Sequence, residues 1–171
     1  MRRRTRPEGP ETPRETIVTY TVDVNATSTA PAEVIFEHLA RADTWAAWAP
    51  IPKPVRAVRA RAGEDADPDG VGAVRRIGPV REEVVAYDPP RHYAYTMLAG
   101  FPINAYRADV TFDRPGDGGT AIRWQGRFEP KIPGTGALTR AFLTLLLGRL
   151  ARAVARHSER CEPGCPAYRP G

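Results

Sequence analysis

The side chains with the clearest potential for chemistry are charged residues on two neighbouring predicted strands. One strand carries Arg75 and Arg76, and the next carries Arg81, Glu82 and Glu83. Successive side chains of a strand point to opposite faces, so at least one of the three consecutive charges points inward. A buried charge is costly without a partner or ligand, and such a group could orient a carboxylate or act as acid or base. A salt bridge at the outer face or rim is the plainer alternative, and the sequence leaves the strand register open.

Other catalytic motifs are weak. The histidines His38, His92 and His157 are far apart in the sequence, and two of them fall on apolar helical arcs, which is typical of packing residues. The only serines are Ser28, a predicted helix cap, and Ser158, predicted on the exterior of a helix, so no serine triad is indicated. The glycine-rich segments GDGG and PGTG lack the Gly-Lys-Ser/Thr of a phosphate loop and predict turns.

Two cysteines, Cys161 and Cys165, stand close together in the segment CEPGC. Their spacing would allow a local disulfide or half of a metal site. No second pair exists, and His157 is the only histidine nearby in the sequence, so a zinc site is not expected. We predict reduced, exposed thiols, no metal and no cofactor.

The positive charge of the chain is concentrated at its beginning. The 171 residues carry a net charge of +5, and five arginines against two glutamates lie in residues 1–14. This distribution indicates a solvated tail rather than a basic folded face, so no nucleic-acid partner is expected. No apolar run approaches the ~18 residues that a membrane span requires, and no signal peptide follows the N-terminal arginines. We therefore predict a cytoplasmic protein without a transmembrane segment.

The elements that would position the charged residues follow a clear order. An alternating strand at 18–24 precedes a helix that begins near Pro31, with Ser28 or Thr29 as its cap. A second short helix at 41–48 would place Trp45 and Trp48 on one face. Short strands separated by turns are then predicted at 55–61, 71–77, 80–87, 92–98, 106–113 and 120–129.

The last predicted element is a long amphipathic helix at 136–160. Its apolar arc contains Phe142, Leu143, Leu146, Leu147, Leu150, Ala153, Val154 and His157. This many apolar side chains need a large partner surface, which a curled antiparallel sheet supplies. The order predicts an α+β protein: a curved antiparallel sheet of about six to seven strands wrapped around a long C-terminal helix, with two short helices after the first strand. We expect a disordered basic tail at 1–15, one domain at 16–160 and a flexible tail at 161–171.

Four segments resemble the START-like (SRPBCC) superfamily, and within it the polyketide cyclase/dehydrase and lipid-transport group. They are PAEVIFEHLARADTWAAWAP, VVAYDPPRHYAY, GGTAIRWQGRF and PKIPGTGALTRAF. The resemblance covers about residues 16 to 160 and implies the helix-grip fold. It does not imply one activity, because members of this superfamily bind lipids, sterols, polyketides or hormones, and only some catalyse reactions.

The resemblance and the strand alternation together predict a cavity between the sheet and the C-terminal helix. The expected ligand-binding residues are Trp48, Glu82, Tyr95, Met97, Tyr106, Val110, Trp124, Phe128, Phe142 and Leu146. The favoured function is binding of a hydrophobic or amphipathic small molecule, such as a lipid or polyketide. Two alternatives stay open: a cyclase or dehydratase that uses polar cavity residues, and a protein-interaction module with a filled core. Catalytic residues are not assigned, and a homodimer is one oligomeric state that the sequence allows.

Overall fold

The computed structural model describes residues 18–51, 55–59, 68–116, 118–162 and 164–165. The predicted tail at 1–15 lies outside these residues, as does the end of the predicted C-terminal tail, 166–171. Within the described residues, no helix is long and apolar enough to cross a membrane.

One antiparallel sheet of seven strands forms the frame of the molecule, in the order β1-β7-β6-β5-β4-β3-β2. The chain enters the sheet at one edge, crosses to the opposite edge after the short helices, and returns strand by strand until β7 pairs with β1. The predicted meander is confirmed, although β6 begins three residues before the predicted start. The strands are β1 (Tyr20–Ser28), β2 (Val55–Arg59), β3 (Ala73–Ile77), β4 (Val80–Asp88), β5 (His92–Ala99), β6 (Ile103–Asp113) and β7 (Thr120–Pro130).

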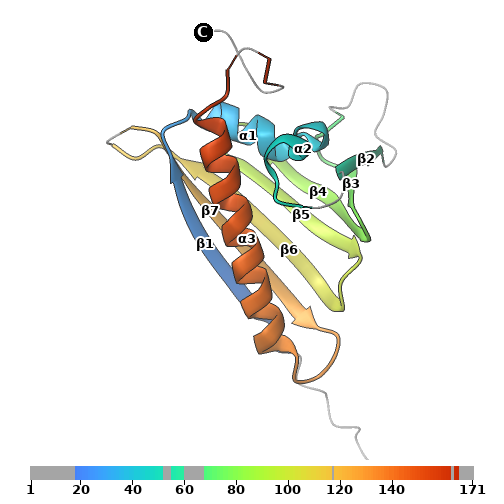
Figure 1. Ribbon diagram of the computed structural model, residues 1–171. Helices are drawn as coiled ribbons and strands as arrows, with labels where there is room; N and C mark the ends of the chain where they lie inside the picture. The colour runs from blue at the N-terminus through green and yellow to red at the C-terminus, as the bar shows by residue number, and fades with distance from the viewer. Residues whose placement is uncertain (1–17, 52–54, 60–67, 117, 163, 166–171) are drawn as a thin grey trace, which may run out of the picture.

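The helices lie on one face of this sheet (Figure 1). The long helix α3 (Gly136–Ser158) runs along β1 and β7. The short helices α1 (Ala32–Ala40) and α2 (Trp45–Trp48), with a 3₁₀ turn η1 (Ala42–Thr44) between them, cover one end of the sheet. This is the helix-grip fold that the order of elements predicted.

The junction between β1 and α1 differs from the prediction. Pro31 is the N-cap of α1, and no side chain caps the helix. Ser28, one of the two expected caps, instead ends β1, where its hydroxyl donates to the carbonyl of Ala155 at 3.0 Å and accepts from the N–H of Ala30 at 3.2 Å. The serine therefore fastens the strand to α3 rather than starting the helix.

The inward face of α3 is rotated relative to the predicted arc. Leu143, Leu147, Leu150 and Val154 are buried as expected, but so are the small residues Gly148, Ala151, Ala155 and Ser158. Ser158 was expected on the exterior, and the prediction was wrong because α1 packs against α3: the rings of His38 and His157 are 4.6 Å apart. Phe142 is 46% exposed, so the first half of α3 shows part of its apolar arc to solvent.

Trp45 and Trp48 share a face, as predicted, with ring centroids 4.6 Å apart. Both rings are buried. The Trp45 indole N–H donates to the carbonyl of Leu39 at 2.9 Å, and that of Trp48 donates to the carbonyl of His38 at 3.0 Å. These bonds satisfy carbonyls at the end of α1 that have no partner within the helix.

The loop before β7 offers a test of the register between β1 and β7. Gly118 and Gly119 both have positive φ, +93° and +75°, but only at Gly119 would a Cβ atom collide with backbone, at the carbonyl oxygen of Ser28. We expect Gly118→Ala to lower the free energy of unfolding by about 1–2 kcal/mol, because only the unfavourable positive φ contributes there. Gly119→Ala should cost clearly more, measured by urea denaturation, and equal losses would contradict the close approach.

Candidate functional site

A buried ion pair lies on the concave face of the sheet. Arg75 in β3 and Glu82 in β4 are directly opposite each other in the antiparallel register, so their side chains share a face. Their side chains are 2% and 9% exposed, and the Arg75 Nη2 atom lies 3.2 Å from Glu82 Oε2. The neighbouring pair, Arg76 and Arg81, points to the other face and is exposed. The structure thus resolves the register that the sequence left open, and it places the ion pair inside rather than at the rim.

Aromatic rings surround the guanidinium of Arg75. Its Cζ atom lies 4.9 Å from the ring centroid of Trp45, 5.1 Å from that of Tyr93 and 5.5 Å from that of Tyr95. Its Nη1 atom donates to the carbonyl of Leu39 at 2.8 Å. Cation–π contacts of this kind stabilise a desolvated guanidinium by about 2 kcal/mol. Together with the ion pair to Glu82, these contacts offset the desolvation cost of burying Arg75.

Tyrosines extend this polar centre along the sheet. Tyr95 lies beside Tyr106, with ring centroids 6.1 Å apart. Trp124 meets Tyr95 edge to face at 6.4 Å. Gly126 in β7 faces the Tyr106 ring, because a Cβ atom there would lie 3.6 Å from its hydroxyl oxygen. The wall of the concave face is therefore aromatic with polar atoms set into it.

Burial controls the protonation of these groups. Burial raises the pKa of Tyr93 to about 12 and raises the pKa values of Tyr95 and Tyr106 as well, so all three phenols stay neutral donors near pH 7. Burial also raises the pKa of Glu82, and the attraction of Arg75 offsets only part of that effect. A carboxyl group with a raised pKa is poised to exchange a proton closer to neutrality than an exposed one.

Three donors on the concave face have no hydrogen-bond partner among the described residues. They are Arg75 Nε, Tyr93 Oη and Trp124 Nε1, and each residue is at most 2% exposed. A buried donor without a partner costs about 1–3 kcal/mol. Native proteins rarely leave such groups unpaired, so each one indicates a place for a ligand atom or a bound water.

The predicted ligand-binding residues divide into three groups by their surroundings. Tyr95, Tyr106, Val110, Trp124 and Phe128 are buried on the concave face, as the strand alternation indicated, and Glu82 is buried beside them. Met97 and Leu146 are partly buried against the same core, and Met97 pairs with Glu82 across the strands.

The remaining two of the predicted residues lie elsewhere. The indole N–H of Trp48 is already bonded within the α1–α2 unit. Phe142 stacks on Phe101 at 5.5 Å near the surface.

Sequence reasoning omitted three residues from its set of ligand-binding side chains. Arg75 could not be told from Arg76 without the register. Tyr93 lies on the same strand face as Tyr95, and the two-residue spacing made it a further candidate outside the expected set. Trp45 was predicted only to share a face with Trp48, and nothing in the sequence indicated that it would contact a buried arginine.

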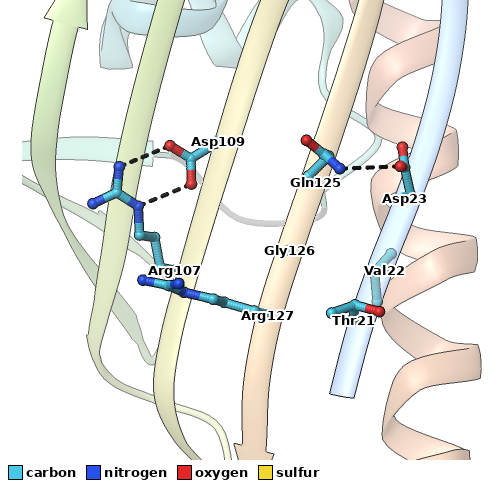
Figure 2. A pocket seen from close by; sticks show the side chains of 8 residues that line it. All are labelled: Thr21, Val22, Asp23, Arg107, Asp109, Gln125, Gly126 and Arg127. Atoms are coloured by element: carbon cyan, nitrogen blue, oxygen red, sulfur yellow. Dashed lines mark hydrogen bonds and ion pairs between the residues drawn. The ribbon is translucent and has the colours of Figure 1, made fainter. Parts of the chain in front are cut away.

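A groove of about 520 Å³ lies on the opposite face of the sheet, away from α3 (Figure 2). It is lined by residues of β1, β6 and β7, most of which face outward: Thr21, Val22, Asp23, Arg107, Asp109, Gln125, Gly126 and Arg127. Most of its charges are already paired, since Arg107 binds Asp109 at 2.8 Å and Gln125 binds Asp23 at 3.1 Å. We regard it as the solvated polar face of the sheet. Near the ion pair, a gap lined by Ala40, Asp69, Val84 and Arg75 is too narrow for a water molecule.

The fold and the buried polar centre define a helix-grip protein, and the comparisons agree. Residues 15–159 match the family model described as polyketide cyclase / dehydrase and lipid transport. The chain belongs to this family, which supports a ligand-binding or cyclase role. No protein of curated function matches the chain.

Several solved structures share the fold. Norcoclaurine synthase from Thalictrum flavum is 14% identical, with a TM-score of 0.66, over 86% of this chain and 98% of that one. The protein XoxI from Bacillus cereus is 17% identical, with a TM-score of 0.61, over 82% and 95%. The di-domain ARO/CYC BexL from the BE-7585A biosynthetic pathway is 16% identical, with a TM-score of 0.63, over 89% of this chain and 51% of that one. At these identities the likeness concerns the fold alone.

The ion pair gives a direct test of the interior. Arg75→Leu should lower the free energy of unfolding by about 3 kcal/mol or more, because it leaves Glu82 buried without its partner. Arg76→Leu, one position along the same strand and exposed, should change it by less than about 0.5 kcal/mol. Urea denaturation measures both values, and similar losses for the two variants would mean that Arg75 is not buried against Glu82.

Proposed function

We propose that the protein binds a hydrophobic small molecule that carries an acceptor oxygen, held between the concave face of the sheet and α3. The observation that supports this most directly is the set of three unpaired donors, Arg75 Nε, Tyr93 Oη and Trp124 Nε1, among buried aromatic rings. A carbonyl, hydroxyl or carboxylate oxygen could accept from one or more of them. The rings would contact the apolar remainder of the molecule.

In β5, Thr96 to Ala99 are less buried than Tyr93 to Tyr95, which favours an entrance at that end of the strand. Met97 is partly exposed and stands across from Glu82, so the ion pair lies one side chain from solvent. Beside it, Phe101 and Phe142 stack between the β5–β6 turn and α3. Leu145 on α3 is 51% exposed. These apolar side chains would contact a hydrophobic molecule as it enters. The interior beyond them is tightly packed, so its side chains would have to move apart to admit the molecule.

Two of the fold neighbours favour an aromatic or polyketide-like ligand over a simple lipid. Norcoclaurine synthase has been observed with dopamine and hydroxybenzaldehyde, both small aromatic molecules that carry oxygen. BexL is an ARO/CYC protein of a biosynthetic pathway. A ligand of this chemistry suits the aromatic wall and the unpaired donors of this chain better than an aliphatic chain would.

Native mass spectrometry before and after extraction with organic solvent tests the proposal. We expect a co-purified small molecule that extraction removes and that binds again on addition. Tyr93→Phe should weaken its binding about fivefold or more, since one hydrogen bond is worth about 1 kcal/mol. The same variant should leave the stability of the empty protein unchanged or raised, because the deleted hydroxyl has no partner there.

Tyr20→Phe is the matched control, because this ring is partly exposed at the β1 edge and should not affect binding. Unchanged affinity in Tyr93→Phe would contradict the proposed pose. A protein that carries no ligand and gains none from a panel of aromatic and polyketide-like compounds would favour the interaction-module alternative, in which Phe142 and Leu145 contact a partner.

A second candidate function is catalysis, which the raised pKa of Glu82 beside Arg75 favours. Glu82 would take a proton from the carbon next to a carbonyl group, and Arg75 would hold the carbonyl oxygen as charge develops on it. Both groups are buried, so water would not compete for the reacting atoms. This is chemistry that a cyclase or dehydratase of an enolisable substrate requires.

Glu82→Gln separates catalysis from binding. If the protein is an enzyme, we expect kcat for an enolisable polyketide substrate to fall about 100-fold or more, while ligand affinity changes little, because the amide keeps the shape of the carboxylate. Glu83→Gln, the next residue on the outward side of β4, should retain activity. Full turnover in Glu82→Gln would rule out Glu82 as the general base.

A further inference from the structure

A second cluster of reactive side chains lies at the far end of α3, away from the concave site. His38 comes from the end of α1, His157 from the last turn of α3, and Cys165 from the segment that follows. The Cys165 Sγ atom is 3.3 Å from His38 Nε2 and 3.9 Å from His157 Nε2. All three donor atoms lie within 4.8 Å of one another.

A fourth ligand is close at hand. Cys161 follows α3 directly, and its half-buried thiol is near enough to Cys165 for the two groups to affect each other's ionisation. The backbone turns here, because the N–H of Cys161 donates to the carbonyl of Ser158 at 3.2 Å and that of Cys165 donates to Glu162 at 2.9 Å. Cys165 thereby lies beside the two histidines. With Cys161 as a fourth ligand, the three-residue cluster would become a site of two imidazoles and two thiols.

The spacing of the donor atoms suits a tetrahedral metal centre. Zinc binds sulfur at about 2.3 Å and imidazole nitrogen at about 2.0–2.1 Å, so tetrahedral geometry requires a sulfur–nitrogen separation of about 3.6 Å. The two observed separations, 3.3 and 3.9 Å, lie on either side of this value. From this geometry we propose that His38, His157, Cys161 and Cys165 bind one zinc ion.

The surroundings fit such an ion. His38 is fully buried, and both cysteines are half-buried and free of disulfide bonds. Two thiolates neutralise the charge of Zn²⁺, so the loaded site would be neutral overall and would not place a net charge in this partly buried position. All four side chains serve as ligands, which makes the site structural rather than catalytic.

Zinc was not expected from the sequence, because His157 is the only histidine near the two cysteines along the chain. His38 lies 127 positions before Cys165 and reaches the site because α1 packs on the end of α3. The ion would join α1, α3 and the following segment at one point. It would thereby hold the end of α3 against α1, two residues beyond Ala155, whose hydrogen bond with Ser28 joins α3 to β1.

The full-length protein, purified under reducing conditions and freed of metal, tests the proposal by titration with Co²⁺ and Zn²⁺. We expect one metal per chain, the visible absorption of tetrahedral thiolate-bound cobalt, its displacement by zinc, and a higher Tm with zinc. Cys165→Ser and His157→Asn should each weaken zinc binding at least about tenfold. Loss of a residue that only hydrogen-bonds a metal ligand already lowers metal affinity by about tenfold or more, and loss of the ligand itself should cost at least as much.

His92→Asn is the matched control, because this histidine binds Asp109 on the sheet, away from the cluster, and should keep full zinc binding. Circular dichroism identifies any variant that fails to fold, and the stoichiometry of the unaltered chain decides the question in that case. The proposal is overturned if the reduced, folded protein binds no cobalt or zinc, or if the metal binds equally well in Cys165→Ser. A Cys161–Cys165 disulfide that persists in the protein as isolated from cells would also overturn it.

Discussion

The buried guanidinium group of Arg75 links the strands at one side of the sheet to the two short helices. Arg75 connects β3 to β4 through Glu82, to α1 through the carbonyl of Leu39, and to three aromatic rings on α2 and β5. Removing two charges from water costs several kcal/mol for each ion, and the attraction between them repays this only when further contacts satisfy the remaining polar atoms. Arg75 has those contacts at Nη1 and Nη2, but not at Nε. The polar interior is thus nearly but not fully satisfied without a ligand, which is the state expected of a binding site.

The two halves of the sheet consequently have different roles. On the β1–β7 side, α3 buries Leu143, Leu147, Leu150 and Val154 against apolar strands, and each such side chain contributes about 1.5–3 kcal/mol. On the β3–β5 side, the concave face carries the ion pair and the tyrosines. The apolar packing on the β1–β7 side compensates for the stability that the unpaired donors cost on the β3–β5 side. This division is how a small fold can keep a polar interior without unfolding.

The end of α1 joins the two polar centres of the structure. Its last carbonyls lack helical partners, and side chains satisfy them: Leu39 accepts from Trp45 and Arg75, and His38 accepts from Thr44 and Trp48. The imidazole ring of the same His38 contacts Cys165 and His157. A metal at that cluster would therefore stiffen the element that supports Arg75, which links the proposed zinc site to the order of the concave site.

The sequence alone determined the order of elements, because strand alternation, helical periodicity and turn residues are local signals, and its resemblance to the START-like superfamily indicated the helix-grip fold and the family. It also placed Tyr95, Tyr106, Val110 and Trp124 on the inner face, because the alternation of side chains is visible within each single strand. It could not choose between Arg75 and Arg76, or among Arg81, Glu82 and Glu83, because a slip of one residue reverses every side chain and only strand pairing fixes the slip. Nor could it join His38 to Cys165. That contact exists because α1 packs across the end of α3, and only the tertiary structure brings together residues so far apart in the chain.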